Sequence, residues 1–151
     1  MKSKLLVLAV LILLPAVFMA LGPQSLTAAS SDAKQSSQLK DNGIGPVKSV
    51  TLGKTIDKKM VDEGQSIFFG KCSLCHAMNS QKLAPPLAGV TKTLSPVFIM
   101  NYLLNTAQMQ EKDPYIQQLM QYYQSVPKMP DQNLSKSQAR AVLEFLRSTE
   151  K

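Results

Sequence analysis

Apolar residues recur at helical spacing in four stretches of this 151-residue chain, and no stretch shows the alternation typical of a β-strand. The first stretch follows Asp57, an expected N-cap, and carries apolar or small residues at Met60, Val61, Gly64, Ile67 and Phe68. The others begin at Ser95-Pro96, at Asp113-Pro114 and at Ser135, which forms a capping box with Gln138. The pattern predicts an all-α fold of about four short helices.

The N-terminal residues have the pattern of a signal peptide. Lys2 and Lys4 precede an apolar run from Leu5 to Leu21, and small residues lead up to Ala29. The run of 17 residues contains Pro15 and is shorter than the ~20 residues that span a membrane. We therefore expect residues 1–29 to be a cleaved export signal, with an uncleaved tether through residues 5–21 as the alternative.

Residues 30–56 are rich in Ser, Gln, Lys and Gly and lack an apolar period, so they are interpreted as a flexible linker or extended segment. The folded domain is expected at residues 57–151. Four short helices and long loops make a small core for a domain of that size, which indicates that a non-protein group fills the middle.

The charge of the chain narrows the class of partner. Seventeen Lys and Arg residues against ten Asp and Glu give a net charge of +7, which suits acidic protein surfaces. The basic residues are not clustered, Trp is absent and aromatic residues make up only 6% of the chain. These features argue against a nucleic-acid-binding platform.

Residues 71–76, "KCSLCH", carry the candidate chemistry. A thioredoxin-like dithiol needs an alternating α/β chain, and a structural zinc needs a fourth ligand that a sequence with no further Cys or His does not offer. A disulfide between Cys72 and Cys75 would enclose two residues and constrain little. The remaining interpretation is covalent attachment of one haem c, with both thiols as thioether donors and His76 as the proximal iron ligand.

The second axial ligand must come from a residue other than His, because His76 is the single histidine. Met1 and Met19 lie in the signal segment, Met78 is too close to His76, and Met60, Met100 and Met120 lie beside apolar helical positions. Met109 is left unassigned. Met129 lies in an irregular loop between Pro127 and Pro130 and is the predicted distal ligand. The alternative is an open, five-coordinate haem that senses a gas or reacts with peroxide.

These residues resemble the class I monohaem cytochromes c of exported bacterial proteins, over about residues 57–151. "EGQSIFFGKCSLCH" is similar to the family's first helix, so the resemblance implies that Gly64 and Phe68 pack against Val142 and Phe145 of the last helix. "APPLAG" resembles the proline loop, which implies that the Pro85 carbonyl accepts a hydrogen bond from the His76 ring. "KMPDQNLS" resembles the Met-Pro ligand loop and supports Met129. The usual glycine before the loop proline is Ala84 here.

The expected function is single-electron transport by Fe(III)/Fe(II) cycling between respiratory redox partners, without enzymatic activity of its own. We expect Lys71, Lys82, Lys92 and Lys128 to surround the haem edge and to attract acidic surfaces on a reductase and an oxidase. The expected location is the periplasm, either in solution or tethered to the outer face of the inner membrane. The alternative is a haem c subunit fixed in a larger oxidoreductase complex, with residues 30–56 as a docking strap.

Overall fold

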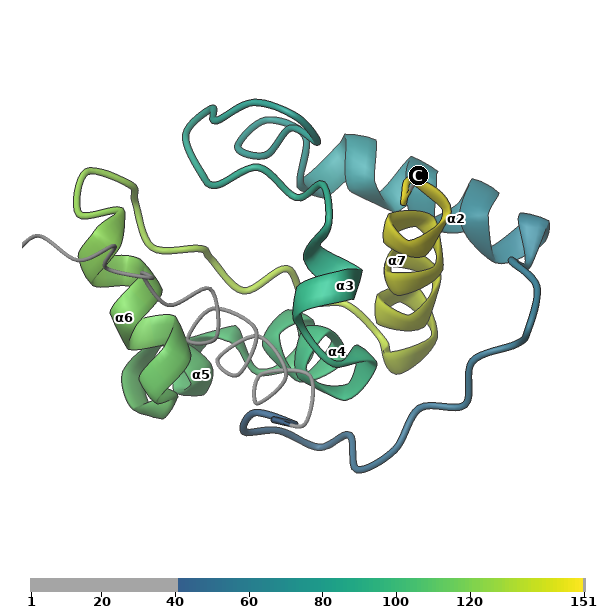
Figure 1. Cartoon of the computed structure of the whole chain (residues 1–151), viewed down its shortest axis with the longest axis horizontal. Helices are drawn as coiled ribbons and strands as arrows, with labels where there is room; N and C mark the ends of the chain where they lie inside the picture. The colour runs from purple at the N-terminus through teal and green to yellow at the C-terminus, as the bar shows by residue number, and fades with distance from the viewer. Residues whose placement is uncertain (1–40, 151) are drawn as a thin grey trace, which may run out of the picture. The chain divides into compact units, whose positions relative to one another are not determined.

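The computed structural model describes residues 41–150, so the predicted signal peptide, the alternative tether and residues 30–40 of the predicted linker lie outside the described residues. Within residues 41–150 the regular structure is helical and no strand is assigned, which confirms the all-α prediction. The helices, shown in Figure 1, are α2 (Lys58–Lys71), α3 (Val90–Thr93), α4 (Pro96–Leu104), α5 (Thr106–Lys112), α6 (Pro114–Tyr122) and α7 (Lys136–Ser148).

The predicted helix starts are confirmed. Side chains of Asp57, Ser95 and Asp113 each accept a hydrogen bond from a backbone N–H in the first turn of α2, α4 and α6. Proline follows directly at the start of α4 and α6, where the missing N–H has no intrahelical partner anyway. Ser135 and Gln138 form the complete capping box of α7.

The structure contains two further short helices, α3 and α5, that the apolar pattern did not predict as separate elements. The chain turns at Asn105 (φ −145°, ψ 43°), which ends α4 and begins α5, so the helix expected from Ser95 is followed at once by a second one. Helix α3 begins after Gly89, whose φ of 80° lies in the left-handed region that favours glycine. The described part of the chain therefore contains six helices where about four were expected.

Helices α2 and α7 cross in close contact, as Figure 1 shows. Gly64 makes this crossing possible, because the Cβ of any other residue at this position would overlap the carbonyl of Ala141 and the Cβ of Phe145. One turn further along α2, the ring of Phe68 packs on that of Phe145 with centroids 5.2 Å apart. The family resemblance predicted that Gly64 and Phe68 pack against Val142 and Phe145. Phe145 lies next to both residues, whereas the backbone nearest to Gly64 is that of Ala141. Val142 is buried in the neighbouring core cluster.

Residues 42–50, which we call the N-terminal strap, form no helix or strand, bend at residues 44–46 and pack onto the helices. Val47 is 1% exposed and belongs to the main core cluster. Asn101 of α4 accepts a hydrogen bond from the Val47 N–H (2.8 Å) and donates to the carbonyls of Asn42 (2.8 Å) and Val47 (3.0 Å). Backbone groups of the strap, which precedes the boundary expected at residue 57, thus find their hydrogen-bond partners on α4.

None of the helices in the range 41–150 is long and apolar enough to cross a membrane.

Candidate functional site

Cys72, Cys75 and His76 lie in a tight turn at the C-terminal end of α2. The Cys72 N–H donates to the Phe68 carbonyl (2.8 Å), and the N–H groups of Cys75 (3.1 Å) and His76 (2.8 Å) both donate to the Cys72 carbonyl. Cys72 is buried, Cys75 is half-buried, and the two are not joined by a disulfide. The turn therefore brings both thiols and the imidazole together at the end of a rigid helix.

The surroundings of Cys72 do not favour a thiolate. Burial raises the pKa of the Cys72 thiol and Cys75 adds to the rise, although the ammonium of Lys71 acts in the opposite direction. A reactive redox dithiol needs a lowered thiol pKa, which the surroundings of Cys72 do not provide. Residues 41–150 also contain no group of three or more His, Cys, Asp or Glu side chains that could hold a metal ion.

The His76 ring is oriented by the proline loop. Its Nδ1 lies 2.8 Å from the Pro85 carbonyl oxygen, and because a carbonyl can only accept, Nδ1 carries a proton; the lone pair of the neutral imidazole is then on Nε2. Backbone N–H groups of Ala84, Leu87 and Ala88 donate to the carbonyls of Cys75 (3.0 Å), Ala77 (3.0 Å) and Met78 (2.9 Å). The loop is thus bound to the backbone around His76 on both sides of Pro85.

Ala84 is accommodated without strain in this loop. It is 8% exposed, and its N–H donates to the Cys75 carbonyl. Among the described non-glycine residues a positive φ occurs at Asn133 alone, so the position taken by the usual glycine of the family does not need the left-handed region here.

Met129 lies in the loop between α6 and α7. Its side chain is half-buried and packs against the main core cluster. The Gln110 side-chain amide donates to its carbonyl (2.7 Å), and the Lys71 ammonium donates to the carbonyl of Gln132 three residues further on (3.1 Å). Sequence patterns did not point to Gln110, because a glutamine in a short helix gives no signal of a contact 19 residues away.

The sulfurs of several other methionines are engaged elsewhere. Met109, which the sequence left unassigned, is fully buried, and its Sδ accepts the Ile44 N–H of the N-terminal strap (2.9 Å). Met100 is 2% exposed inside the main core cluster. Met78 accepts a weak hydrogen bond from the Thr149 hydroxyl at 3.8 Å. Of these three, Met100 was expected to fill the core, and its burial agrees with that role.

The residues present fit a haem. An imidazole with a free Nε2 and a loop thioether form a donor set known for haem iron, and two thiols lie beside the imidazole. Apolar side chains that pack on the core yet stay only half-buried are what a surface covered by an apolar disc would have; Met78, Leu87, Val90, Leu94 and Met129 are among them. Leu83, two residues before Pro85, is an apolar side chain that is more exposed than these (53%).

The four lysines expected around the site are exposed side chains. The ammonium of Lys82 donates to the Ser73 carbonyl (2.7 Å), so its charge lies beside the Cys-Cys-His turn. The bond from Lys71 to Gln132 links the end of α2 to the Met129 loop. Lys92 lies 3.6 Å from the Glu150 carboxylate, which reduces the net charge there.

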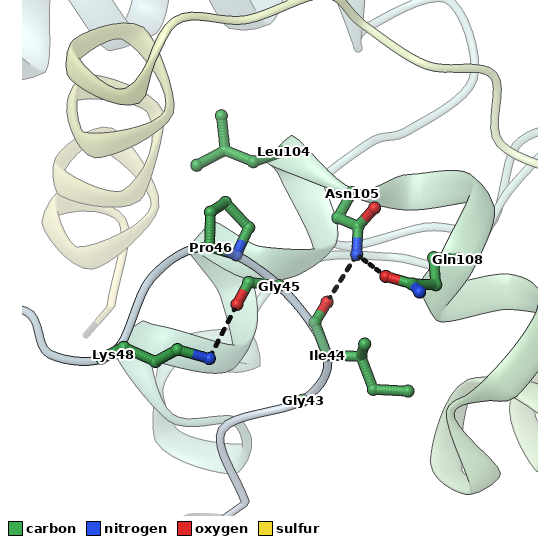
Figure 2. Close-up of a pocket in the computed structure, with 8 residues that line it drawn as sticks. All are labelled: Gly43, Ile44, Gly45, Pro46, Lys48, Leu104, Asn105 and Gln108. Carbon is green, nitrogen blue, oxygen red and sulfur yellow. Dashed lines mark hydrogen bonds between the residues drawn. The ribbon is translucent and has the colours of Figure 1, made fainter.

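A separate shallow pocket of about 590 Å³ lies between the N-terminal strap and helices α4 and α5, as Figure 2 shows. Its lining contains none of the predicted site residues.

Comparisons with known proteins support this picture. Residues 61–150 match the family model of cytochrome c. Among solved structures, the cytochrome c from Rhodothermus marinus is similar, with a TM-score of 0.66 and 42% identity over 70% of this chain and 89% of that chain. An engineered form of that cytochrome gives 0.64 and 41%, over 70% and 90%. An engineered form bound to a carbene intermediate gives 0.63 and 40%, over 70% and 89%.

A search of curated proteins found no match to the chain. Members of the cytochrome c family carry electrons and bind haem c covalently, which agrees with the thiols, imidazole and helical fold described above. The family match covers more than half of the chain, and the fold and the helix crossing agree with it. The chain therefore belongs to the cytochrome c family, as a class I monohaem c-type cytochrome whose cofactor is covalent haem c.

Proposed function

We propose that this cytochrome shuttles single electrons between redox partners outside the cytoplasm, with haem attached through Cys72 and Cys75 and iron held by His76 and Met129. Haem c supplies a one-electron Fe(III)/Fe(II) couple when bound. The observation that carries the proposal is the 2.8 Å bond between His76 Nδ1 and the Pro85 carbonyl, within the turn that also holds both thiols.

The contribution of each residue follows from its contacts. Pro85 keeps the proton on Nδ1, so that Nε2 presents its lone pair with a fixed ring orientation. The thioether of Met129, a soft ligand without charge, favours the reduced state relative to a second nitrogen ligand and raises the reduction potential. If His76 and Met129 both held the iron, no site would remain for oxygen or peroxide; a five-coordinate sensor would require that Met129 not bind.

The N-terminal strap favours a mobile shuttle over a fixed subunit. Its backbone is bound by Asn101 of α4, and Val47 fills the protein's own core. Backbone groups of residues 42–47 are therefore bound within this chain, which supports the shuttle over a strap that docks a second protein. Export to the periplasm is proposed from the sequence of residues 1–29.

Electron exchange with small charged reagents tests the proposed role of the lysines. We expect oxidation–reduction with anionic iron–EDTA to slow as salt is added, and exchange with a cationic cobalt–phenanthroline complex to speed up. Replacing Lys128 by Gln should slow the reaction with the anionic reagent about twofold at low salt, the effect of one charge near the site. The measurement is stopped-flow absorbance at several ionic strengths.

Lys58→Gln is the matched control. Lys58 is exposed and begins α2, whereas the Cys-Cys-His turn follows the other end of this 14-residue helix. The substitution removes the same charge about 20 Å from the turn, given the rise per residue of an α-helix. Equal effects of Lys58→Gln and Lys128→Gln on the rate, or rates independent of salt, would contradict the proposed grouping of lysines around the haem edge.

A further inference from the structure

Gln110 is a buried polar side chain whose contacts point to the Met129 loop. It lies on α5 and is 8% exposed. Its Nε2 donates to the Met129 carbonyl at 2.7 Å, while its Oε1 is buried and has no hydrogen-bond partner among the described residues. A buried amide with one orphaned oxygen costs stability, so packing alone does not account for a glutamine at this position.

Helix α5, which carries Gln110, is itself held in place by the N-terminal strap. The sulfur of Met109, the residue next to Gln110, accepts the Ile44 N–H at 2.9 Å. At the start of the helix, Asn105 donates to the Ile44 carbonyl at 3.0 Å, a bond drawn in Figure 2. Gln110 therefore extends from a helix that is bound at two points along its length.

The Met129 loop has few other ties. Among the described residues, side-chain hydrogen bonds reach residues 124–134 from outside this loop at two places, Gln110 to Met129 and Lys71 to Gln132. The second comes from an exposed ammonium, where water competes for the bond. The bond from Gln110 is part-buried and comes from a buried side chain, and it is made to the backbone of the predicted ligand itself.

We propose that Gln110 is a positioning residue that holds the Met129 backbone in the conformation from which its thioether ligates the iron. This inference rests on the proposed His76/Met129 ligation. The bond from Gln110 restricts the loop and so opposes loss of the thioether to competing ligands. The residue touches neither the iron nor the thiols in this role; it acts through Met129.

Replacing Gln110 by Leu or Met removes the donor and the orphaned oxygen together while keeping the side-chain volume similar. The test follows binding of free imidazole to the oxidised holoprotein, since imidazole competes with the thioether for iron. We expect imidazole to bind about tenfold more tightly to either variant, the effect of losing one buried hydrogen bond. We also expect the thioether charge-transfer band at the red end of the oxidised spectrum to weaken. Denaturant unfolding should stay close to that of the wild type.

Gln108→Leu is the control, because Gln108 is exposed on the same helix and accepts from Asn105 rather than contacting the loop. It should leave imidazole binding unchanged. If both Gln110 variants bind imidazole with the affinity of the wild type and keep the thioether band, the proposed role of Gln110 alone is overturned. A wild-type protein without the band would overturn the ligation by Met129 and this inference with it.

A measurement on the unmodified protein covers the case in which the variants do not fold. The side-chain amide protons of Gln110, observed by nuclear magnetic resonance in the reduced holoprotein, should exchange with solvent much more slowly than those of Gln108. Exchange of the two at similar rates would show that the bond to Met129 is not maintained, and would overturn the inference.

Discussion

The carboxylate of Glu144 shows how a single buried charge is stabilised in this domain. It is 1% exposed and accepts hydrogen bonds from Arg140 (2.6 Å), Arg147 (2.7 Å) and the N–H of Asp57 (3.0 Å). Burial alone would raise the pKa of Glu144, but the Asp57 N–H and the two guanidinium groups outweigh it and leave the pKa below its ordinary value of 4.5. Glu144 thus links α7 to the start of α2.

The lowered pKa predicts how stability depends on pH. Between the pKa in the folded protein and the ordinary value of 4.5, the unfolded chain binds more protons, so stability rises with pH in that window. The contribution is complete above the ordinary value and is lost below the folded one. Glu144→Gln should destabilise the protein by about 2 kcal/mol at neutral pH and reduce the loss of stability on acidification.

Denaturant titrations of the oxidised protein at a series of acidic and neutral pH values measure both effects. Glu63→Gln is the control, because Glu63 is exposed on α2. An acid profile that is the same in wild type and Glu144→Gln would show that Glu144 is not ionised within this network.

At the residue scale, the sequence predicts what local chemistry determines. Asp57, Ser95 and Asp113 were recognisable as caps because their partners lie in the next turn of the same segment. Asn101 and Gln110 were not recognisable. Their partners are backbone groups 54 and 19 residues away, and a single polar residue in a helix does not indicate which distant carbonyl it will meet.

At the scale of elements, the crossing of α2 and α7 determines where the Cys-Cys-His turn begins. Gly64 allows the two helices to approach until the Ala141 carbonyl lies where a side chain would be. Phe68 and Phe145 then pack ring to ring, in a cluster that also includes Cys72. The packing that holds α2 therefore extends to the first of the two attachment cysteines.

Gly64→Ala tests this close approach. The added methyl group would overlap the Ala141 backbone, which cannot move away as a flexible side chain can, so we expect a loss of about 3 kcal/mol in the free energy of unfolding. Gly70→Ala, on the same helix, has no heavy atom within 4 Å of the added carbon and should stabilise the protein by up to about 1 kcal/mol. Guanidinium unfolding of both variants makes the comparison. Similar stabilities would mean that the helices do not approach this closely in solution.

The elements with strong apolar periods were predicted correctly, and the short or irregular ones were not. Helix α3 is four residues long and has no buried residue, so its sequence carries no periodic signal. Helix α5 follows α4 directly, and its separation depends on the backbone conformation of Asn105. The N-terminal strap has no helical or strand period, and its order comes from contacts with α4 and α5 rather than from any pattern of its own.

At the scale of the whole molecule, the sequence motifs and the fold agree on one covalent haem c in an all-α domain, as in the Rhodothermus marinus cytochrome c. The proximal side was predictable because its partners lie within one loop, from Cys72 to Pro85. The distal side was less predictable, because several methionines could in principle supply the second iron ligand. Ligation by Met129 stays a prediction, made for a methionine in the loop between α6 and α7, whereas Met100 and Met109 are buried in the packing of the helices.

The electronic spectrum of the oxidised protein tests the central claim, iron held by His76 and Met129, most directly. The wild type should be low-spin and show the weak thioether charge-transfer band at the red end of the visible range, and Met129→Leu should lose this band. Met120→Leu, a half-buried methionine packed against Phe98, Met109 and Ile116, should retain it. A high-spin wild-type spectrum, or a band that persists in Met129→Leu, would contradict the account.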